Sequence, residues 1–93
     1  MLIEFAPHVS LRRTSTGVVM LFDQADGIMY ELNDTASDIA IFLTELGPCD
    51  AGQIRDALLS NYDAEPDQIG MDVDALLGDF TERGLIRDAQ PSA

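Results

Sequence analysis

The fold of this chain is decided by Gly27-Ile28-Met29-Tyr30-Glu31-Leu32-Asn33-Asp34-Thr35. The first part of this stretch is typical of a short β-strand, and the second part begins a helix with no intervening loop. Alternate side chains share a face of the strand: Ile28, Tyr30 and Leu32 on one, Met29 and Glu31 on the other. We expect this strand to be the open edge of a small sheet, available to pair with another peptide.

Two further strands are predicted before this one. Residues 9–14 alternate apolar and polar side chains at their start, and residues 17–23 contain a continuous apolar run rich in β-formers. The loop at residues 23–27 ends in Gly27, which adopts a positive φ readily. The three strands therefore predict an antiparallel meander. Residues 1–8 are expected to be a short lead-in, and no later strand is expected to pair with the third one.

Three helices are predicted after the strands. The first follows the N-cap Asn33 and ends at Gly47-Pro48, the second begins at Asp50, and the third runs from Pro66 to about Arg83. Apolar stripes mark their core faces: Ala36, Ile39, Ala40, Leu43 and Leu46; then Ile54, Leu58 and Tyr62; then Ile69, Val73, Leu76, Leu77 and Phe80.

This order of elements predicts an α+β fold, in which a three-stranded antiparallel sheet is followed by three helices in a winged helix-turn-helix-like shape. Ninety-three residues suit one domain over residues 1–93, with an ordered core at about 9–87 and a frayed tail at 87–93.

The charge of the chain is strongly acidic. It has 17 acidic residues against 5 arginines and no lysine, for a net charge of −12. Such a surface repels phosphate backbones and anionic lipids, so neither nucleic acid nor a membrane is the expected partner. A basic partner is attracted instead. The single cysteine, the lack of a long apolar run and the lack of a signal peptide indicate a cytoplasmic protein.

Catalytic chemistry finds little support in the sequence. His8 is the only histidine, and no cysteine or second histidine lies at metal-ligand spacing from it. Cys49 occupies a hydrophobic-staple position with Ile54, which favours a structural role over a nucleophilic one. No glycine-rich phosphate loop is present. We therefore expect a binding protein with no metal and no cofactor, and not an enzyme.

The third predicted helix offers two flanks beside its core stripe. One flank holds Asp72, Ala75, Leu76, Asp79 and Arg83, and the other holds Gly70, Asp74, Leu77 and Thr81. We favour the first flank as the wall of a peptide groove because it combines apolar and charged atoms. Asp79 and Arg83 also have the spacing of a simple exposed i,i+4 ion pair.

Two parts of the sequence resemble PqqD-like proteins. Residues 27–36 resemble the strand-to-helix signature Y-x-L-N-x-T-A, and Asp72-Val73-Asp74-Ala75-Leu76-Leu77 with Gly84-Leu85-Ile86 resembles the third helix of that family and its end. The resemblance covers about residues 9–87. It implies a RiPP recognition element, in which the leader segment of a ribosomally made precursor peptide adds to the third strand and lies against the third helix.

The resemblance also implies partners and site residues. It is greatest to the stand-alone leader-binding protein of lasso-peptide biosynthesis, which serves a leader protease and a cyclase. The chaperone of the coenzyme PQQ pathway, which serves a radical SAM enzyme, is the nearest sister. The expected peptide-binding residues are Gly27, Ile28, Met29, Tyr30, Glu31, Leu32, Asp72, Ala75, Leu76, Asp79 and Arg83.

Other functions stay open at this point. A winged-helix DNA-binding regulator has a similar shape but needs a basic recognition helix, and the second and third helices have one arginine each, Arg55 and Arg83. An acyl carrier needs an Asp-Ser-Leu helix start, which the chain lacks. Tyr30 and Leu32 are expected to be core residues, whereas Met29 is a candidate peptide contact. The free strand edge is also available to a second copy of the chain, which would give a homodimer.

Overall fold

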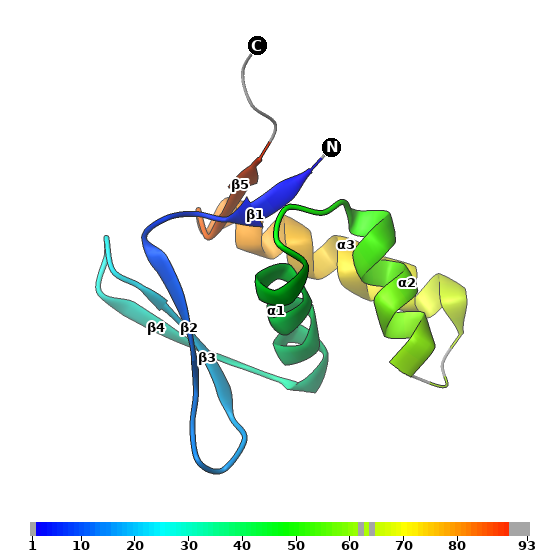
Figure 1. Cartoon of the computed structure of the whole chain (residues 1–93), viewed down its shortest axis with the longest axis horizontal. Coiled ribbons are helices and arrows are strands. Elements are labelled where there is room, and N and C mark those ends of the chain that lie inside the picture. The colour runs from blue at the N-terminus through cyan, green and yellow to red at the C-terminus, as the bar shows by residue number, and fades with distance from the viewer. Residues whose placement is uncertain (1, 62, 64, 90–93) are drawn as a thin grey trace.

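Strand β3 (Val19–Asp23) is the centre of a three-stranded antiparallel sheet. The computed structural model in Figure 1 describes residues 2–61, 63 and 65–89. Strand β2 (Val9–Arg13) pairs with one edge of β3, and strand β4 (Ile28–Leu32) pairs with the other. The predicted meander and the α+β class are confirmed.

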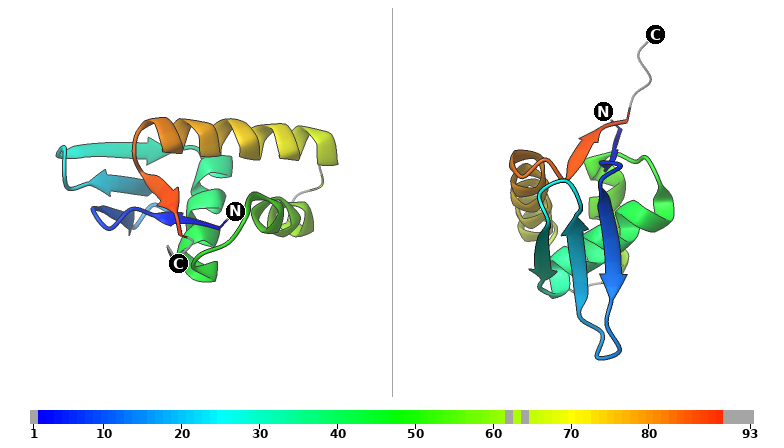
Figure 2. Two further views of the ribbon diagram at one scale, coloured as in Figure 1. Left: turned by 90° about the horizontal axis from the view of Figure 1, so that it is seen from above. Right: turned by 90° about the vertical axis from the view of Figure 1, so that its left-hand side faces the viewer.

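The register puts one face of the sheet into the core. Leu21 of β3 stands opposite Leu11 on one side and Tyr30 on the other, and its side chain is fully buried. The helices cover this face only, as the right-hand view of Figure 2 shows with the sheet in front of them.

The three predicted helices are confirmed as α1 (Asp34–Leu46), α2 (Ala51–Asn61) and α3 (Pro66–Glu82). The Asn33 side chain accepts a hydrogen bond from the Ala36 N–H at 2.9 Å, so the N-cap of α1 follows β4 directly. Asp50 and Gln53 form a reciprocal capping box at α2, with bonds of 2.8 and 2.9 Å. Tyr62, predicted for the stripe of α2, lies outside the described residues.

The core joins all of these elements. Its buried members come from β3, the three helices, and the segments before and after them: Ile3, Leu21, Ile39, Ala40, Leu43, Cys49, Ile54, Leu58, Ile69, Val73, Leu77, Phe80, Leu85 and Ile86. Tyr30, Leu32 and Leu76 are partly buried and pack against this cluster. The strand β4 and the flank of α3 thus rest on one shared core.

A second, two-stranded sheet corrects the expectation for both ends of the chain. Strand β1 (Ile3–Phe5) pairs antiparallel with β5 (Ile86–Asp88), where a lead-in and a frayed tail were expected. Apolar burial explains the pairing, because Ile3 and Ile86 are both in the core. Strands of three residues are too short to show a period, so the sequence pattern did not reveal them. The rest of the tail, residues 90–93, lies outside the described part.

Strand β5 follows the helices, but the expectation that no later strand pairs with β4 holds among the described residues. Strand β5 pairs with β1 and not with β4. Ile28 shares the inward face of β4 in register, but its side chain is 44% exposed because it lies at the hairpin end of the strand.

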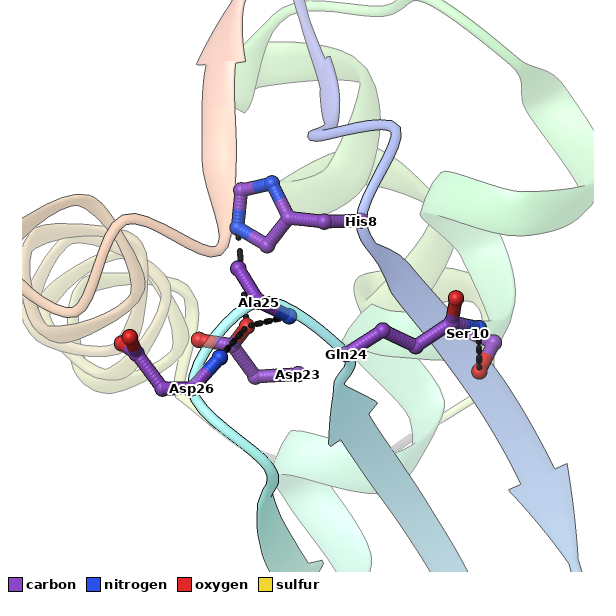
Figure 3. Close-up of polar contacts among 6 residues, drawn as sticks. All are labelled: His8, Ser10, Asp23, Gln24, Ala25 and Asp26. Carbon is purple, nitrogen blue, oxygen red and sulfur yellow. Dashed lines mark hydrogen bonds and ion pairs between the residues drawn. The ribbon is translucent and has the colours of Figure 1, made fainter.

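The hairpin between β3 and β4 is organised by the buried carboxylate of Asp23 (Figure 3). Its Oδ1 atom accepts hydrogen bonds from the N–H groups of Ala25 at 3.0 Å and Asp26 at 3.2 Å. His8 Nε2 lies 3.8 Å from the same atom. Gly27 completes the turn with φ of 70°, which only glycine adopts without strain. These bonds fix the start of β4.

We expect Asp23→Ala to destabilise the fold, because the backbone N–H groups of Ala25 and Asp26 lose the charged acceptor that holds the turn. The predicted loss in the free energy of unfolding is about 1–3 kcal/mol, measured by urea denaturation. Asp26→Ala is the matched control, since the Asp26 side chain is exposed and its backbone bond is retained. Equal losses in the two variants would contradict this account of the turn.

Cys49 is predicted to lower the stability of the folded chain at alkaline pH. Burial raises the pKa of its thiol, and the neighbouring Asp50 adds to the rise. As pH rises, the Cys49 thiol therefore ionises in the unfolded state before it does so in the folded state. The free energy that the buried thiol contributes to folding is fully present below its ordinary pKa, and it is lost as pH rises through the pKa of the folded state. In urea denaturation between pH 7 and 10, the stability advantage of the native chain over Cys49→Ala should shrink above about pH 8.5. A constant difference would refute the prediction.

A groove between strand β4 and helix α3

The outer edge of β4 is open within the described part of the chain, because β4 pairs with β3 alone. The alternation of backbone groups shows which residues face outward. Gln24 N–H donates to the His8 carbonyl on the β2 side, whereas the Asp23 carbonyl accepts from Gly27 on the β4 side. Residues 19, 21 and 23 of β3 thus direct their backbone groups to β4. It follows that the backbone groups of Tyr30 bond to β3, while the N–H and C=O groups of Met29 and Glu31 point to the free edge.

Helix α3 lies beside this edge (Figure 2). Residues of both elements line a groove between them. The groove consists of two cavities of about 370 Å³ each. They adjoin each other, since both are lined by Asn33, Ala36, Leu76 and Asp79. The first cavity also has Thr35, Asp72 and Ala75, and the second also has Met29, Tyr30, Glu31, Leu32, Phe80, Arg83 and Leu85.

Most of the residues predicted for the site line this groove. All five predicted residues of α3 do so: Asp72, Ala75, Leu76, Asp79 and Arg83. From the strand, the lining residues are Met29, Tyr30, Glu31 and Leu32. Gly27 and Ile28 do not line it, because they belong to the hairpin end of the strand. On the opposite flank of α3, Leu77 is buried in the core.

The start of α1 adds residues that the sequence analysis did not assign to the site. Asn33, Thr35 and Ala36 line the first cavity. A signal for them was present in the sequence, since an N-cap directly after an edge strand puts the first turn of the helix at the end of that edge. Phe80 and Leu85 were missed because they contribute to both the core and the groove.

Arg83 joins the two walls of the groove. Its Nε donates to both carboxylate oxygens of Asp79 at 3.0 Å, and its guanidinium carbon lies 5.1 Å from the centre of the Tyr30 ring. The hydrogen bond to Asp79 and then the one to Tyr30 raise the pKa of Arg83. The expected i,i+4 pair is therefore present, and it also contacts β4 across the groove.

Exposure separates the strand residues into two groups. Tyr30 and Leu32 are partly buried against the core, in keeping with the expectation for them. Met29 is 51% exposed and stands opposite Phe22 on the face that the helices leave uncovered. The open edge thus carries an apolar side chain on its outer face and an aromatic ring in the groove.

The described residues include no group of three or more His, Cys, Asp or Glu side chains placed to hold a metal ion. Within the same ranges, no helix has the length and apolarity to cross a membrane. What the site offers is a row of free backbone groups beside a wall with apolar and charged atoms.

Comparison with known proteins identifies the family. Residues 18–86 match the family model of the coenzyme PQQ synthesis protein D (PqqD). The chain belongs to the PqqD family. The matched residues include β3, β4 and all three helices, and with them every residue that lines the groove. The resemblance of residues 27–36 and 72–86 to PqqD-like proteins is confirmed.

Individual relatives of this PqqD-family chain agree with the match. The "PqqA binding protein" of Rhodopseudomonas palustris is 38% identical over 58 residues, which are 60% of this chain and 57% of that protein. The match thus spans little more than half of that relative. A solved "Lasso peptide synthetase B1 complexed with the leader peptide" is 27% identical, with a TM-score of 0.76 over 91% of this chain and 96% of that one. A complex of TbiB1 with the TbiA(beta) leader peptide shares the fold at a TM-score of 0.81 and 18% identity, over 95% and 99% of the two chains.

Proposed function

We propose that this protein binds the leader segment of a ribosomally synthesised precursor peptide by β-strand addition to β4, in the groove between β4 and α3. The observation that carries the proposal is the free edge of β4 along that groove, where Met29 and Glu31 direct their backbone groups outward. An extended peptide satisfies those groups as a fourth strand.

The backbone of β4 would supply affinity for the peptide, and the walls of the groove would supply specificity. Backbone hydrogen bonds to β4 demand little of the peptide sequence, whereas side chains that enter the groove are selected by its walls. Because successive side chains of a strand point to opposite faces, every second peptide residue would face α3. The others would extend the uncovered face that carries Met29 and Phe22.

The open edge of β2 is the structural alternative for strand addition. The sheet order β2-β3-β4 leaves β2 at the other edge. The edge of β4 is favoured because α3 and the start of α1 provide cavities beside it. Pairing of β4 with a second copy of the chain would use the same backbone groups, so a homodimer would compete with peptide binding.

The relatives support a peptide as the ligand. One solved structure at 27% identity is a complex with a leader peptide, and the Rhodopseudomonas palustris relative is named for binding PqqA. We propose further that this protein is a cytoplasmic adaptor without chemistry of its own, which delivers the bound precursor to a lasso-type leader protease and cyclase. The alternative is a chaperone for a radical SAM enzyme, as in the PQQ pathway, and the 38% identity to the PqqA binding protein favours it.

Proline substitutions test strand addition at the two edges. Met29→Pro and Glu31→Pro each remove an outward N–H from β4 while keeping the bonds to β3. We expect each variant to bind at least about fivefold more weakly, since one hydrogen bond contributes about 1 kcal/mol. Fluorescence anisotropy would measure this with labelled synthetic peptides that cover the leader segments of candidate precursors.

Arg13→Pro is the matched control, because Arg13 is exposed and directs its N–H to the free edge of β2. Its affinity should stay within about twofold of that of Arg13→Ala, which reports the loss of charge alone. Unchanged binding in folded Met29→Pro and Glu31→Pro, or a loss confined to Arg13→Pro, would reject the edge of β4 as the binding site.

A further inference from the structure

The two cavities of the groove differ in charge. In the second cavity, the Asp79 carboxylate is neutralised by Arg83, whose Nε lies 3.0 Å from both of its oxygens. The first cavity contains no cation. It has Asp72 in addition to Asp79, and the only hydrogen bond that Asp72 accepts within the described part of the chain is the 2.9 Å bond from the neutral Gln68 amide to Oδ1. Among the described residues that line the first cavity, Asp72 is thus the carboxylate with a free oxygen and no counter-charge.

The first cavity combines an apolar surface with polar side chains. Ala36, Ala75 and Leu76 provide its hydrocarbon surface, and Asp72 lies with the polar residues Asn33 and Thr35. A lysine or arginine side chain has the matching shape, because its methylene stem covers apolar surface while its charged head reaches a carboxylate. The volume of about 370 Å³ leaves room for one such side chain.

The start of α1 is the competing electrostatic feature of this cavity. The positive end of a helix dipole is equivalent to about half an elementary charge, and it favours an anion. Asp34 in the first turn of α1 offsets that partial charge, and Asp72 adds a full negative charge. The net charge of −12 acts in the same direction, because it attracts basic peptides and repels acidic ones. A cation is therefore the favoured occupant.

We propose, on the basis of the proposed function, that the first cavity selects a lysine or arginine of the bound peptide through Asp72. Asp72 and Arg83 lie about three turns apart on α3, which is about 16 Å. An extended peptide covers that distance in about five residues. Because every second residue of an extended peptide faces α3, the basic residue lies about four or six positions from the peptide residue beside Arg83 and Tyr30, beyond the end of β4.

A random 12-residue peptide library on phage, selected on the biotinylated full-length chain, tests this assignment. Enriched peptides should share a lysine or arginine at one position. Replacing that lysine with norleucine, which keeps the stem, should weaken binding to the native chain roughly two- to tenfold. In Asp72→Asn the same replacement should have no effect, and Asp72→Arg should enrich aspartate or glutamate at that position.

Asp74→Asn is the matched control, because Asp74 is exposed on the same helix and does not line the groove. It should keep the basic preference of the native chain. Two outcomes would overturn this inference and leave the proposed function standing. In both, the enriched peptides need the free N–H groups of Met29 and Glu31. Either they show no preference for a basic residue, or they keep that preference in Asp72→Asn. A selection that enriches nothing, or enriches peptides indifferent to Met29→Pro and Glu31→Pro, would overturn both.

Discussion

The junction of β4 with α1 is the constraint on which the groove depends. Leu32 ends the strand, Asn33 caps the helix, and the helix begins at Asp34. The Ser37 hydroxyl donates to the Leu32 carbonyl at 3.3 Å, which ties the first turn of α1 back to the strand. With no flexible loop between them, the strand edge and the first turn of the helix keep one relative placement. The first cavity exists because that turn stands at the end of the open edge.

The pairing of the last strand explains why the edge of β4 stays available. The chain makes one more strand after its helices, but the short return through Gly84 carries β5 to β1. There Ile86 joins Ile3 in the core, and Arg87 pairs with Glu4 at 2.8 Å. The last strand thus pairs with β1 and leaves the outer edge of β4 open. Arg83 faces the groove and contacts Tyr30, so helix and strand are connected beside the edge without filling it.

Sequence reasoning predicted the elements with a clear period and missed those without one. The alternation in residues 28–32 and the helical stripes specify the sheet and the helices, because each pattern repeats often enough to exclude other structures. Ile3–Phe5 and Ile86–Asp88 have no such repeat, and their pairing depends on tertiary contacts. The exposure of Ile28 depends on where the helices end relative to the hairpin, which no local pattern contains. The α3 flank was predictable from helical geometry, whereas Phe80 serves both core and groove and so could not be separated from the core stripe.

The central claim is that a peptide becomes the fourth strand of the sheet on β4. Amide hydrogen exchange, followed by NMR on the full chain with and without a bound leader segment, tests it most directly. We predict that the amides of Met29 and Glu31 exchange at least about tenfold more slowly in the complex, while that of Tyr30 changes little because it already bonds to β3. The amides of Leu11 and Arg13, on the edge of β2, should not change. Protection that appears on β2, or that leaves Met29 and Glu31 unchanged in the saturated complex, would contradict the account.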